Sequence, residues 1–513
     1  MSETRGRRAP ATNLGLLDAT MIGIGAMIGA GIFVLTGLAA ETAGAGAIVA
    51  FALNGGVTTF TALSYAELAA AIPKNGGGYA YVREAFSSPV AFVMGWTRWF
   101  TYMAAGALYA LGFSSNFVEL VHLYWPGLPD SEPWIVAYAL FAVVSFVGLN
   151  ALSTEASGGA ETVVTAVKIV VLLIFVAFGV GAVQGANFVP LFPADGGALT
   201  VLPAMGLTFI AFQGYDLIAT VTEEVENPTT NIPRAILASV AVTVVVYLLV
   251  VGVAIGTLGP ELLAAAGETA VAEAAIGFMP DVGVFGAPLG GALIAFGAVF
   301  STVSALNAVV IGSSRVAFAM GRERQLPAGL GRIHPRYGTP WLAIAASAVV
   351  MLVATVSAPI RVVGNLASLF SLLGFAVVNL ALIRLRRRRP NLSRPFEVPA
   401  YPAVPLLGIG LNLLLGLFIS WETWAIAIGW LGVGVVVYAV LHGPSLPFGR
   451  GEPSGDPGAS AGGTAPAEGP VVVETPAADA ADPWRERDGP SPDGEDAREV
   501  EVDPPASDTE EER

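Results

Sequence analysis

The chain has no cysteine, which excludes disulfide bonds, iron–sulfur clusters and thiol nucleophiles. Histidine is almost as scarce, and the three present, His122, His334 and His442, are too far apart for metal-ligand spacing. A phosphate-binding loop is also absent, because Gly76-Gly77-Gly78 is not followed by Lys and Ser or Thr. We therefore expect no metal, no cofactor, no ATP-driven step, no enzymatic nucleophile and no nucleic-acid partner.

Charge is scarce too. Only 13% of the 513 residues are charged, against about 25% in soluble domains. By contrast, 54% are hydrophobic and the mean hydropathy is +0.68. Lysine occurs only at Lys74 and Lys168. Long uncharged runs repeat down the chain, which predicts a multi-pass helical membrane protein whose main partner is the lipid bilayer.

Twelve of these runs can each cross a hydrocarbon core of roughly 30 Å, which takes about 20 helical residues. The sequence thus predicts an all-α membrane protein with twelve transmembrane helices between residues 17 and 442, preceded by a cytoplasmic N-terminus at 1–16. The spans are expected at 17–40, 46–72, 89–122, 134–153, 162–185, 202–222, 234–258, 287–318, 341–358, 362–384, 402–420 and 424–442.

Basic residues indicate the orientation, since cytoplasmic loops of membrane proteins are rich in Lys and Arg. The connections between the predicted spans fall into two alternating sets, one basic and one acidic. The acidic set contains Arg361 as its only base. We therefore expect both termini in the cytoplasm of a cell-membrane protein. The basic set is Arg5, Arg7, Arg8, Lys74, Arg83, Arg234, Arg322, Arg324, Arg332, Arg336 and Arg386 to Arg389.

The net charge of −15 belongs mostly to the end of the chain. Residues 443–513 hold 18 Asp and Glu but only 5 Lys and Arg, whereas the rest of the chain is nearly neutral. A segment rich in Gly, Pro, Ala and acids cannot bury enough apolar surface to fold alone. We expect a disordered, acidic cytoplasmic tail.

The spacing of the spans suggests two halves, residues 17–185 and 202–384, followed by two further helices at 402–442. Because each half contains five spans, an odd number, the second half would cross the membrane in the opposite direction. The first span of each half is expected to contain a helix break, at a similar depth in both. Such paired breaks are typical of inverted-repeat secondary transporters, whose site lies between the repeats.

The first break is expected at Gly29-Ala30-Gly31, with a new half-helix starting near Gly31. The free N–H groups and partial positive charge of a helix N-terminus suit a carboxylate. The alternative is tight helix packing, because Gly25 and Gly29 also form a small-xxx-small pattern.

The second break is expected at Phe212 to Asp216. An acid inside a span is costly, which makes Asp216 a functional candidate that would gate the cavity, take a proton or bond freed backbone. A purely structural cap of the broken helix is the alternative. Glu67 lies closer to the interface and is expected to be structural. Arg98 and Arg315 are expected near cytoplasmic ends, satisfied by snorkelling or by lipid phosphates.

Lys168 lies in the fifth predicted span on one helical face with Glu161 and Thr165. One interpretation is an amine that loads and releases a proton during transport. A permanently charged ammonium in place of a coupling sodium ion is a second. Snorkelling to the interface is a third.

Several motifs occur in a specific order along residues 14 to about 442. They are Gly29-Ala30-Gly31-Ile32-Phe33, Tyr65-Ala66-Glu67-Leu68, Pro73 to Tyr79, Phe212 to Asp216, Glu223 to Pro228, Asn231 to Ile236, Arg315 with Ala319 to Arg322 and Leu326-Pro327, and Arg394-Pro395-Phe396 with Pro399 to Pro402. In this order they resemble the amino acid–polyamine–organocation permeases, especially the cationic amino acid transporter-like and prokaryotic amino acid permease branches.

The resemblance implies a five-plus-five inverted repeat with two extra helices. It also implies a substrate carboxylate bound by backbone at the first break (Ile28, Gly29, Ala30, Gly31) and an amine bound at the second (Phe212, Gln213, Gly214, Asp216). Lys168 resembles a lysine that replaces sodium in proton-coupled members, with Ser304 as its neighbour. This chain has Ala30 where some members have serine, and Asp216 where others have glutamate. Because of these two differences, the resemblance does not specify the substrate.

These observations predict a secondary amino acid transporter that works by alternating access and symports protons. An amine or polyamine carrier, or an exchanger, of the same fold is the first alternative. A nutrient sensor with little turnover is the second, although the tail shows no folded signalling domain. The sequence names neither the amino acid nor the oligomeric state.

Overall fold

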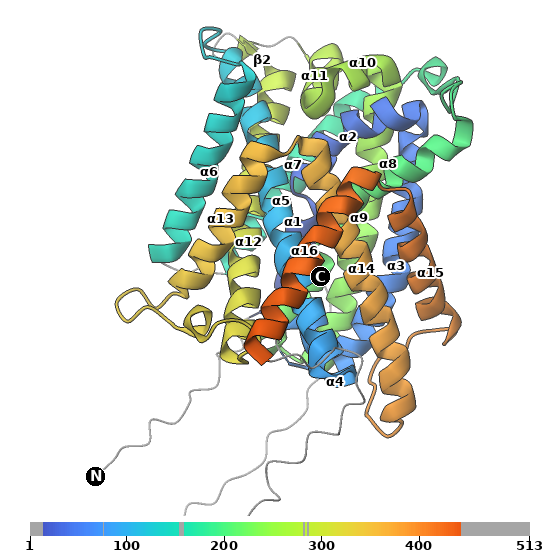
Figure 1. Cartoon of the computed structure of the whole chain (residues 1–513). Coiled ribbons are helices and arrows are strands. Elements are labelled where there is room, and N and C mark those ends of the chain that lie inside the picture. Colours follow the sequence, from blue (N-terminus) through green and yellow to red (C-terminus); the bar gives the residue numbers. More distant parts are fainter. Residues whose placement is uncertain (1–13, 75, 153–157, 281–282, 285–286, 443–513) are drawn as a thin grey trace, which may run out of the picture. The chain divides into compact units, whose positions relative to one another are not determined.

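The computed structural model of the chain describes residues 14–74, 76–152, 158–280, 283–284 and 287–442. These residues are almost entirely helical (Figure 1), apart from the two-residue antiparallel strands β1 (Gly283–Val284) and β2 (Ala287–Pro288). The helices are α1 (Leu16–Met27), α2 (Ala30–Ala43), α3 (Ala47–Ala71), α4 (Gly77–Ala85), α5 (Ser88–His122), α6 (Glu132–Leu152), α7 (Gly158–Gly179), α8 (Val201–Thr208), α9 (Pro228–Leu258), α10 (Pro260–Ala266), α11 (Ala270–Phe278), α12 (Leu289–Arg322), α13 (Trp341–Ser357), α14 (Ile360–Arg388), α15 (Ala403–Leu417) and α16 (Trp421–His442).

Among the described residues, nine helical stretches are long and apolar enough to cross a membrane. The first of them runs from Leu16 to Ala71 and contains α1, α2 and α3. Two shorter apolar helices, α13 and α15, come in addition. The prediction of an all-helical, multi-pass membrane protein is confirmed. The predicted tail at 443–513 and most of the N-terminus at 1–16 lie outside the described residues.

Every predicted span overlaps a helix, but the structure adds helices that hydropathy did not indicate. These are α4, between the second and third predicted spans, and α10 and α11, between the seventh and eighth. They were missed because they are short, seven to nine residues each, well below the length needed to span a bilayer. In Figure 1, α4 lies at one end of the helical domain, and α10 and α11 lie at the other.

Proline marks the beginning of several helices. Pro89, Pro228 and Pro260 stand in the first turn of α5, α9 and α10. Proline fits there because its ring presets the helical φ and its missing N–H would have no partner inside the helix. At the other end of α14, Arg386, Arg387 and Arg388 occupy the last turn, where positive charge complements the helix dipole.

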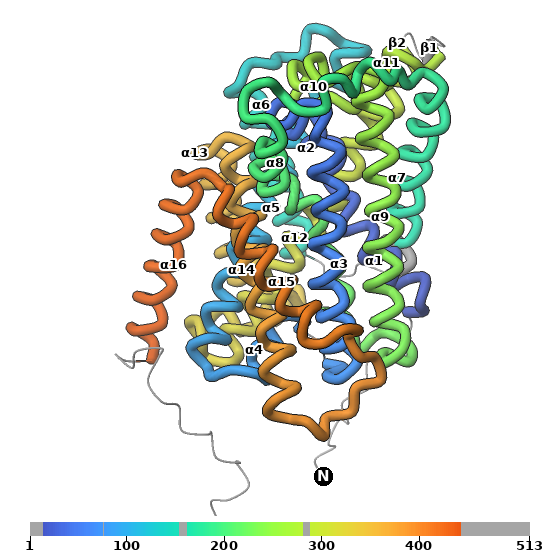
Figure 2. The backbone as a smooth tube through the Cα atoms, turned by 90° about the vertical axis from the view of Figure 1, so that its right-hand side faces the viewer, coloured from blue at the N-terminus to red at the C-terminus, as the bar shows by residue number. Residues whose placement is uncertain are grey.

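The interior is built around the interrupted helices. α1 packs against α7 and α9, and α5 packs against α12 and α14. In the 18-residue segment used to judge hydropathy, 89% of the residues of the α1–α3 stretch are buried inside the protein, whereas only 17% of those of α16 are buried. Figure 2 shows α16 at the edge, with α3 beside α9. α16 therefore presents most of its apolar side chains outward, as a helix facing lipid would.

A buried carboxylate joins three segments near the α4 end. Glu67, at the end of α3, is fully buried. It accepts hydrogen bonds from Arg386 of α14 at 2.5 and 2.7 Å and from the backbone N–H of Val398 at 2.7 Å. Arg394 lies 3.4 Å away. The residue thus has the structural role expected from the sequence, because it holds the segment before α15 against α3.

Breaking this cluster should destabilise the protein. In Glu67→Gln, two largely buried arginines lose their carboxylate, and removing one partner of a buried pair costs about 3–5 kcal/mol. We expect the unfolding temperature in detergent to fall clearly, as measured by tryptophan fluorescence.

The matched control is Glu84→Gln on α4. Partial burial by itself raises the pKa of Glu84, but Lys74 and Arg389 lower it below its ordinary value. Both partners of Glu84 are more than half exposed. The free energy of unfolding should therefore fall by less than about 1 kcal/mol in Glu84→Gln. Equal destabilisation by the two variants would contradict the role given to Glu67.

Candidate substrate and coupling site

The first break is present, and it lies at Ile28 and Gly29, between α1 and α2. α2 begins at Ala30, one residue before the expected start. The Ser301 hydroxyl donates to the carbonyls of Ile28 and Gly29 at 2.7 and 3.3 Å. Because a hydroxyl has a single proton, Ser301 donates to one of these carbonyls at a time. The first N–H groups of α2 have no partner within the helix. The start of α2 thus has backbone donors at the break, and their binding of a carboxylate stays a prediction.

The second break lies between α8 and α9. The helix tightens to a 3₁₀ turn, η5 (Phe209–Phe212), opens at Gln213 and Gly214, and continues as a second 3₁₀ helix, η6 (Tyr215–Thr220). Gly214 has a φ of +142°, which side chains rarely adopt. The segment after the break is therefore a 3₁₀ helix rather than an α-helix. Stretches of 3₁₀ geometry inside a span often mark a functional hinge.

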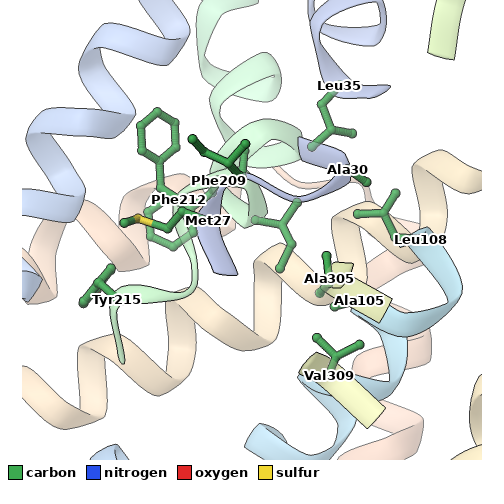
Figure 3. Close-up of a cluster of buried hydrophobic side chains, with 14 of the residues drawn as sticks. Met27, Ala30, Leu35, Ala105, Leu108, Phe209, Phe212, Tyr215, Ala305 and Val309 are labelled. Atoms are coloured by element: carbon green, nitrogen blue, oxygen red, sulfur yellow. The ribbon is translucent and has the colours of Figure 1, made fainter. Parts of the chain in front are cut away.

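The two breaks are in direct contact, with glycine at each contact. A Cβ atom at Gly31 would lie 2.5 Å from Cβ of Ala211, and one at Gly214 would lie 2.7 Å from backbone atoms of Ala26 and Met27. Figure 3 shows Met27 of the first break beside Phe212 of the second. The expected juxtaposition of the breaks is therefore observed.

Tyr247 of α9 joins both breaks, and the sequence reasoning missed it. Its hydroxyl lies 2.5 Å from the carbonyl of Met27 and 3.0 Å from that of Ala211. A hydroxyl has a single proton and donates to one carbonyl at a time. The carbonyl of Met27 also accepts the N–H of Gly29 at 2.8 Å, so the capacity for a further donor lies at Ala211. The sequence could have indicated this residue, because Tyr247 carries the one polar side-chain group in the apolar run from Val244 to Val251.

The side chains of the second break pack against other helices. Phe212 is fully buried and contacts the rings of Phe51 and Tyr247, with centroids 5.9 and 5.2 Å away. The amide oxygen of Gln213 accepts a hydrogen bond from Ser371 of α14 at 2.8 Å. The break is thus fixed by α3, α9 and α14.

α7 contacts α1 through a ladder of polar groups. Thr162 donates to Asp18, Thr165 to the carbonyl of Met21, and the Lys168 ammonium to the carbonyl of Gly25 at 2.9 Å. Lys168 is fully buried, so the snorkelling alternative is wrong. The side chain of Glu161, which was expected on this face, lies outside the described residues.

Ser304 lies on α12, half-buried and one helical turn from Ser301. It is Ser301 that reaches the first break. The sequence had indicated a polar patch on this helix, but spacing alone does not say which hydroxyl points inward. The role of Ser304 beside Lys168 stays a prediction.

The expectation for Arg98 is wrong. Its side chain is 5% exposed and pairs with Asp216, which is 3% exposed. Arg98 lies ten residues into α5, about 15 Å from the start of the helix, which is too deep to reach the interface easily. Asp216 in turn accepts a hydrogen bond from the N–H of Gly214 at 3.2 Å. The sequence placed the two charges in different spans and gave no sign of their contact. Arg315, by contrast, is exposed as expected.

Overpacking the contact between the breaks should impair the site. In Gly31→Ala the new methyl group meets Ala211, and overpacking costs roughly 1–3 kcal/mol. We expect the affinity for substrate to fall by about tenfold, as measured by ligand-induced thermal stabilisation. Gly56→Ala on α3 is the control, because a Cβ there meets nothing within 4 Å. The same loss in both variants would contradict the packing argument.

Taken together, a bundle of apolar helices with two interrupted helices touching in its interior defines a membrane transporter, and the chain is not an enzyme. A family profile described as amino acid permease matches residues 14–447, and the chain belongs to this family.

Curated relatives extend this result. The chain is 30% identical to the branched-chain amino acid permease of Bacillus subtilis over 460 residues, which cover 85% of this chain and 94% of the relative. It is 30% identical to the methylthioribose transporter of the same organism over 438 residues, 83% and 93% of the two chains. It is 32% identical to the Asc-type amino acid transporter 1 of Mus musculus, over 81% of this chain and 78% of the relative.

Proposed function

We propose that this permease is a secondary active transporter that moves amino acids across the cell membrane by alternating access, in symport with protons. The observation that carries the proposal is the contact between the two helix breaks, with the Lys168 ammonium bonded to a carbonyl of the first broken helix. A break at this depth is tolerated only where it is buried in protein or lines a cavity, and in transporters it forms the binding site.

Twelve spans in an inverted repeat form part of the proposal. The stretch from Leu16 to Ala71 has 56 residues and is long enough for two crossings. With that stretch counted twice and with α13 and α15 added, the nine apolar stretches correspond to twelve spans. The similar interruptions in the first and sixth of these support two repeats of five spans.

The charges at the two ends support cytoplasmic termini. The α4 end carries Lys74, Arg83 and the arginines at the end of α14. The α10 end carries Glu41, Glu261 and Glu268, with Arg361 paired to Glu41. By the positive-inside rule the α4 end faces the cytoplasm.

The proposed substrate position follows from backbone chemistry. The N–H groups at Ala30 and Gly31 begin a helix and favour an anion such as the substrate carboxylate. The carbonyls of Met27 and Ala211 share one hydroxyl proton from Tyr247. The carbonyl of Met27 also accepts the N–H of Gly29, so the carbonyl of Ala211 supplies the acceptor capacity for the substrate ammonium, and the two opposite charges of an amino acid would bridge the two breaks.

Lys168 provides the coupling in this proposal. The charged ammonium holds α7 against the carbonyl of Gly25 near the end of α1. A neutral amine would bond this carbonyl less strongly, because charge-assisted hydrogen bonds are about twice as strong as neutral ones. Loss of the proton would therefore release α1 and let the half-helix move.

Proton coupling is tested in liposomes. Purified protein should accumulate labelled isoleucine when the outside is acidified, and Lys168→Ala should reduce accumulation to the level of protein-free liposomes. Lys74→Ala is the matched control, since Lys74 is the other lysine and its side chain is 66% exposed. Uptake that depends on sodium alone and survives Lys168→Ala would overturn the coupling.

The carboxylate position predicts which compounds compete. Isoleucine should inhibit uptake of a labelled amino acid, whereas isoleucine amide, which lacks the carboxylate, should not. An amine carrier would accept both compounds. The methylthioribose transporter among the relatives makes this test important, because methylthioribose has neither an α-carboxylate nor an ammonium group. Inhibition by methylthioribose but not by isoleucine would contradict amino acid transport.

A further inference from the structure

Arg98 and Asp216 form an ion pair in the interior, beside the second break. No other ion pair among the described residues has both side chains 5% exposed or less. Arg98 belongs to α5 and Asp216 to η6, so the pair joins the third and sixth predicted spans. Buried charges are costly unless they are paired. Each of these two residues therefore needs the other to offset the cost of burying its charge.

The surroundings of the pair contain rings and no second acid among the described residues. The guanidinium carbon of Arg98 lies 4.9 Å from the ring centre of Tyr102 and 5.6 Å from that of Phe375. Tyr65 and Tyr215 pack edge to face beside them, with centroids 5.7 Å apart. Arg98 also donates to the Tyr102 hydroxyl at 2.9 Å. Cation–π contacts and this hydrogen bond hold the guanidinium against Asp216.

The pair belongs to the proposed site. One carboxylate oxygen of Asp216 accepts the N–H of Gly214, and Gly214 lies against Ala26 and Met27 at the end of α1. The charge of Asp216 therefore lies at the junction of the two breaks, where a substrate would bind. Arg98 engages the other oxygen, so both oxygens of the acid already have a partner.

A buried carboxylate without a partner would favour a bound cation, and the side chain of lysine would supply one. Arg98 removes this preference, because the pair has no net charge. It also adds repulsion, since an incoming ammonium would meet the guanidinium, and like charges at close range cost several kcal/mol. The buried Nη1 of Arg98 has no hydrogen-bond partner among the described residues, and a cationic side chain, which carries only donors, cannot satisfy it.

We propose that Arg98 is a positioning residue that sets the charge selectivity of the site: by pairing with Asp216 it excludes amino acids with cationic side chains and admits those with uncharged ones. This inference rests on the proposed function of amino acid transport. It assigns Asp216 a permanent partner and leaves Lys168 as the group that exchanges the proton.

Competition in liposomes tests the inference. Uptake of labelled isoleucine is measured against unlabelled lysine and unlabelled isoleucine, and the ratio of their half-inhibitory concentrations is compared between variants. Wild type should be inhibited by isoleucine and hardly by lysine. In Arg98→Gln the free carboxylate should make lysine a stronger competitor, lowering the ratio by at least about tenfold. Arg98→Lys, which keeps the charge, should resemble wild type.

The double variant Arg98→Gln/Asp216→Asn separates selectivity from folding. It contains no unpaired charge and should return the ratio to the wild-type value, even if the single variant fails to fold. Arg315→Gln, on the exposed part of α12, is the control for loss of an arginine. A wild type inhibited equally by lysine, an unchanged ratio in Arg98→Gln, or a lowered ratio in the double variant would overturn the role of Arg98. A wild type that transports no amino acid would instead overturn the proposed function.

Discussion

Backbone hydrogen bonding in a medium without water is the constraint on which this structure depends. A helix that stops in the membrane interior exposes N–H and C=O groups, and each unsatisfied group costs several kcal/mol in hydrocarbon. At both breaks, hydroxyl groups of neighbouring helices donate to the freed carbonyls. The Ser301 hydroxyl lies within hydrogen-bond distance of the carbonyls of Ile28 and Gly29, and the Tyr247 hydroxyl of one carbonyl from each break. Each hydroxyl donates to one of its two carbonyls at a time. These bonds attach α12 to the first break and α9 to both breaks.

Contact between the breaks also explains where glycine is needed. Gly31 and Gly214 are the points of closest approach, and a methyl group at either would overlap the opposing chain. Substrate groups that bind between the breaks would then meet backbone atoms rather than side chains. Recognition by backbone suits the carboxylate and ammonium that all amino acids share, and it leaves discrimination to side chains around the breaks.

The buried charges follow a common pattern, each with a partner on another helix. Lys168 bonds a carbonyl of α1, Asp216 pairs with Arg98 of α5, and Glu67 pairs with Arg386 of α14. In low dielectric such partners are obligatory, and they also link segments that are far apart in the sequence.

The sequence by itself determined the membrane class, the approximate spans and the position of both breaks. These properties are read from neighbouring residues, since hydropathy acts over about 20 residues and glycine acts on its own backbone. It also singled out Lys168 and Asp216, because an ionisable group in an apolar run is conspicuous. Only the tertiary structure decided that Arg98 neutralises Asp216 and that Tyr247 joins the breaks. Arg98 and Asp216 are 118 positions apart in the sequence, and Tyr247 is 36 positions from Ala211. A single sequence carries no record of which distant side chains meet when the helices pack.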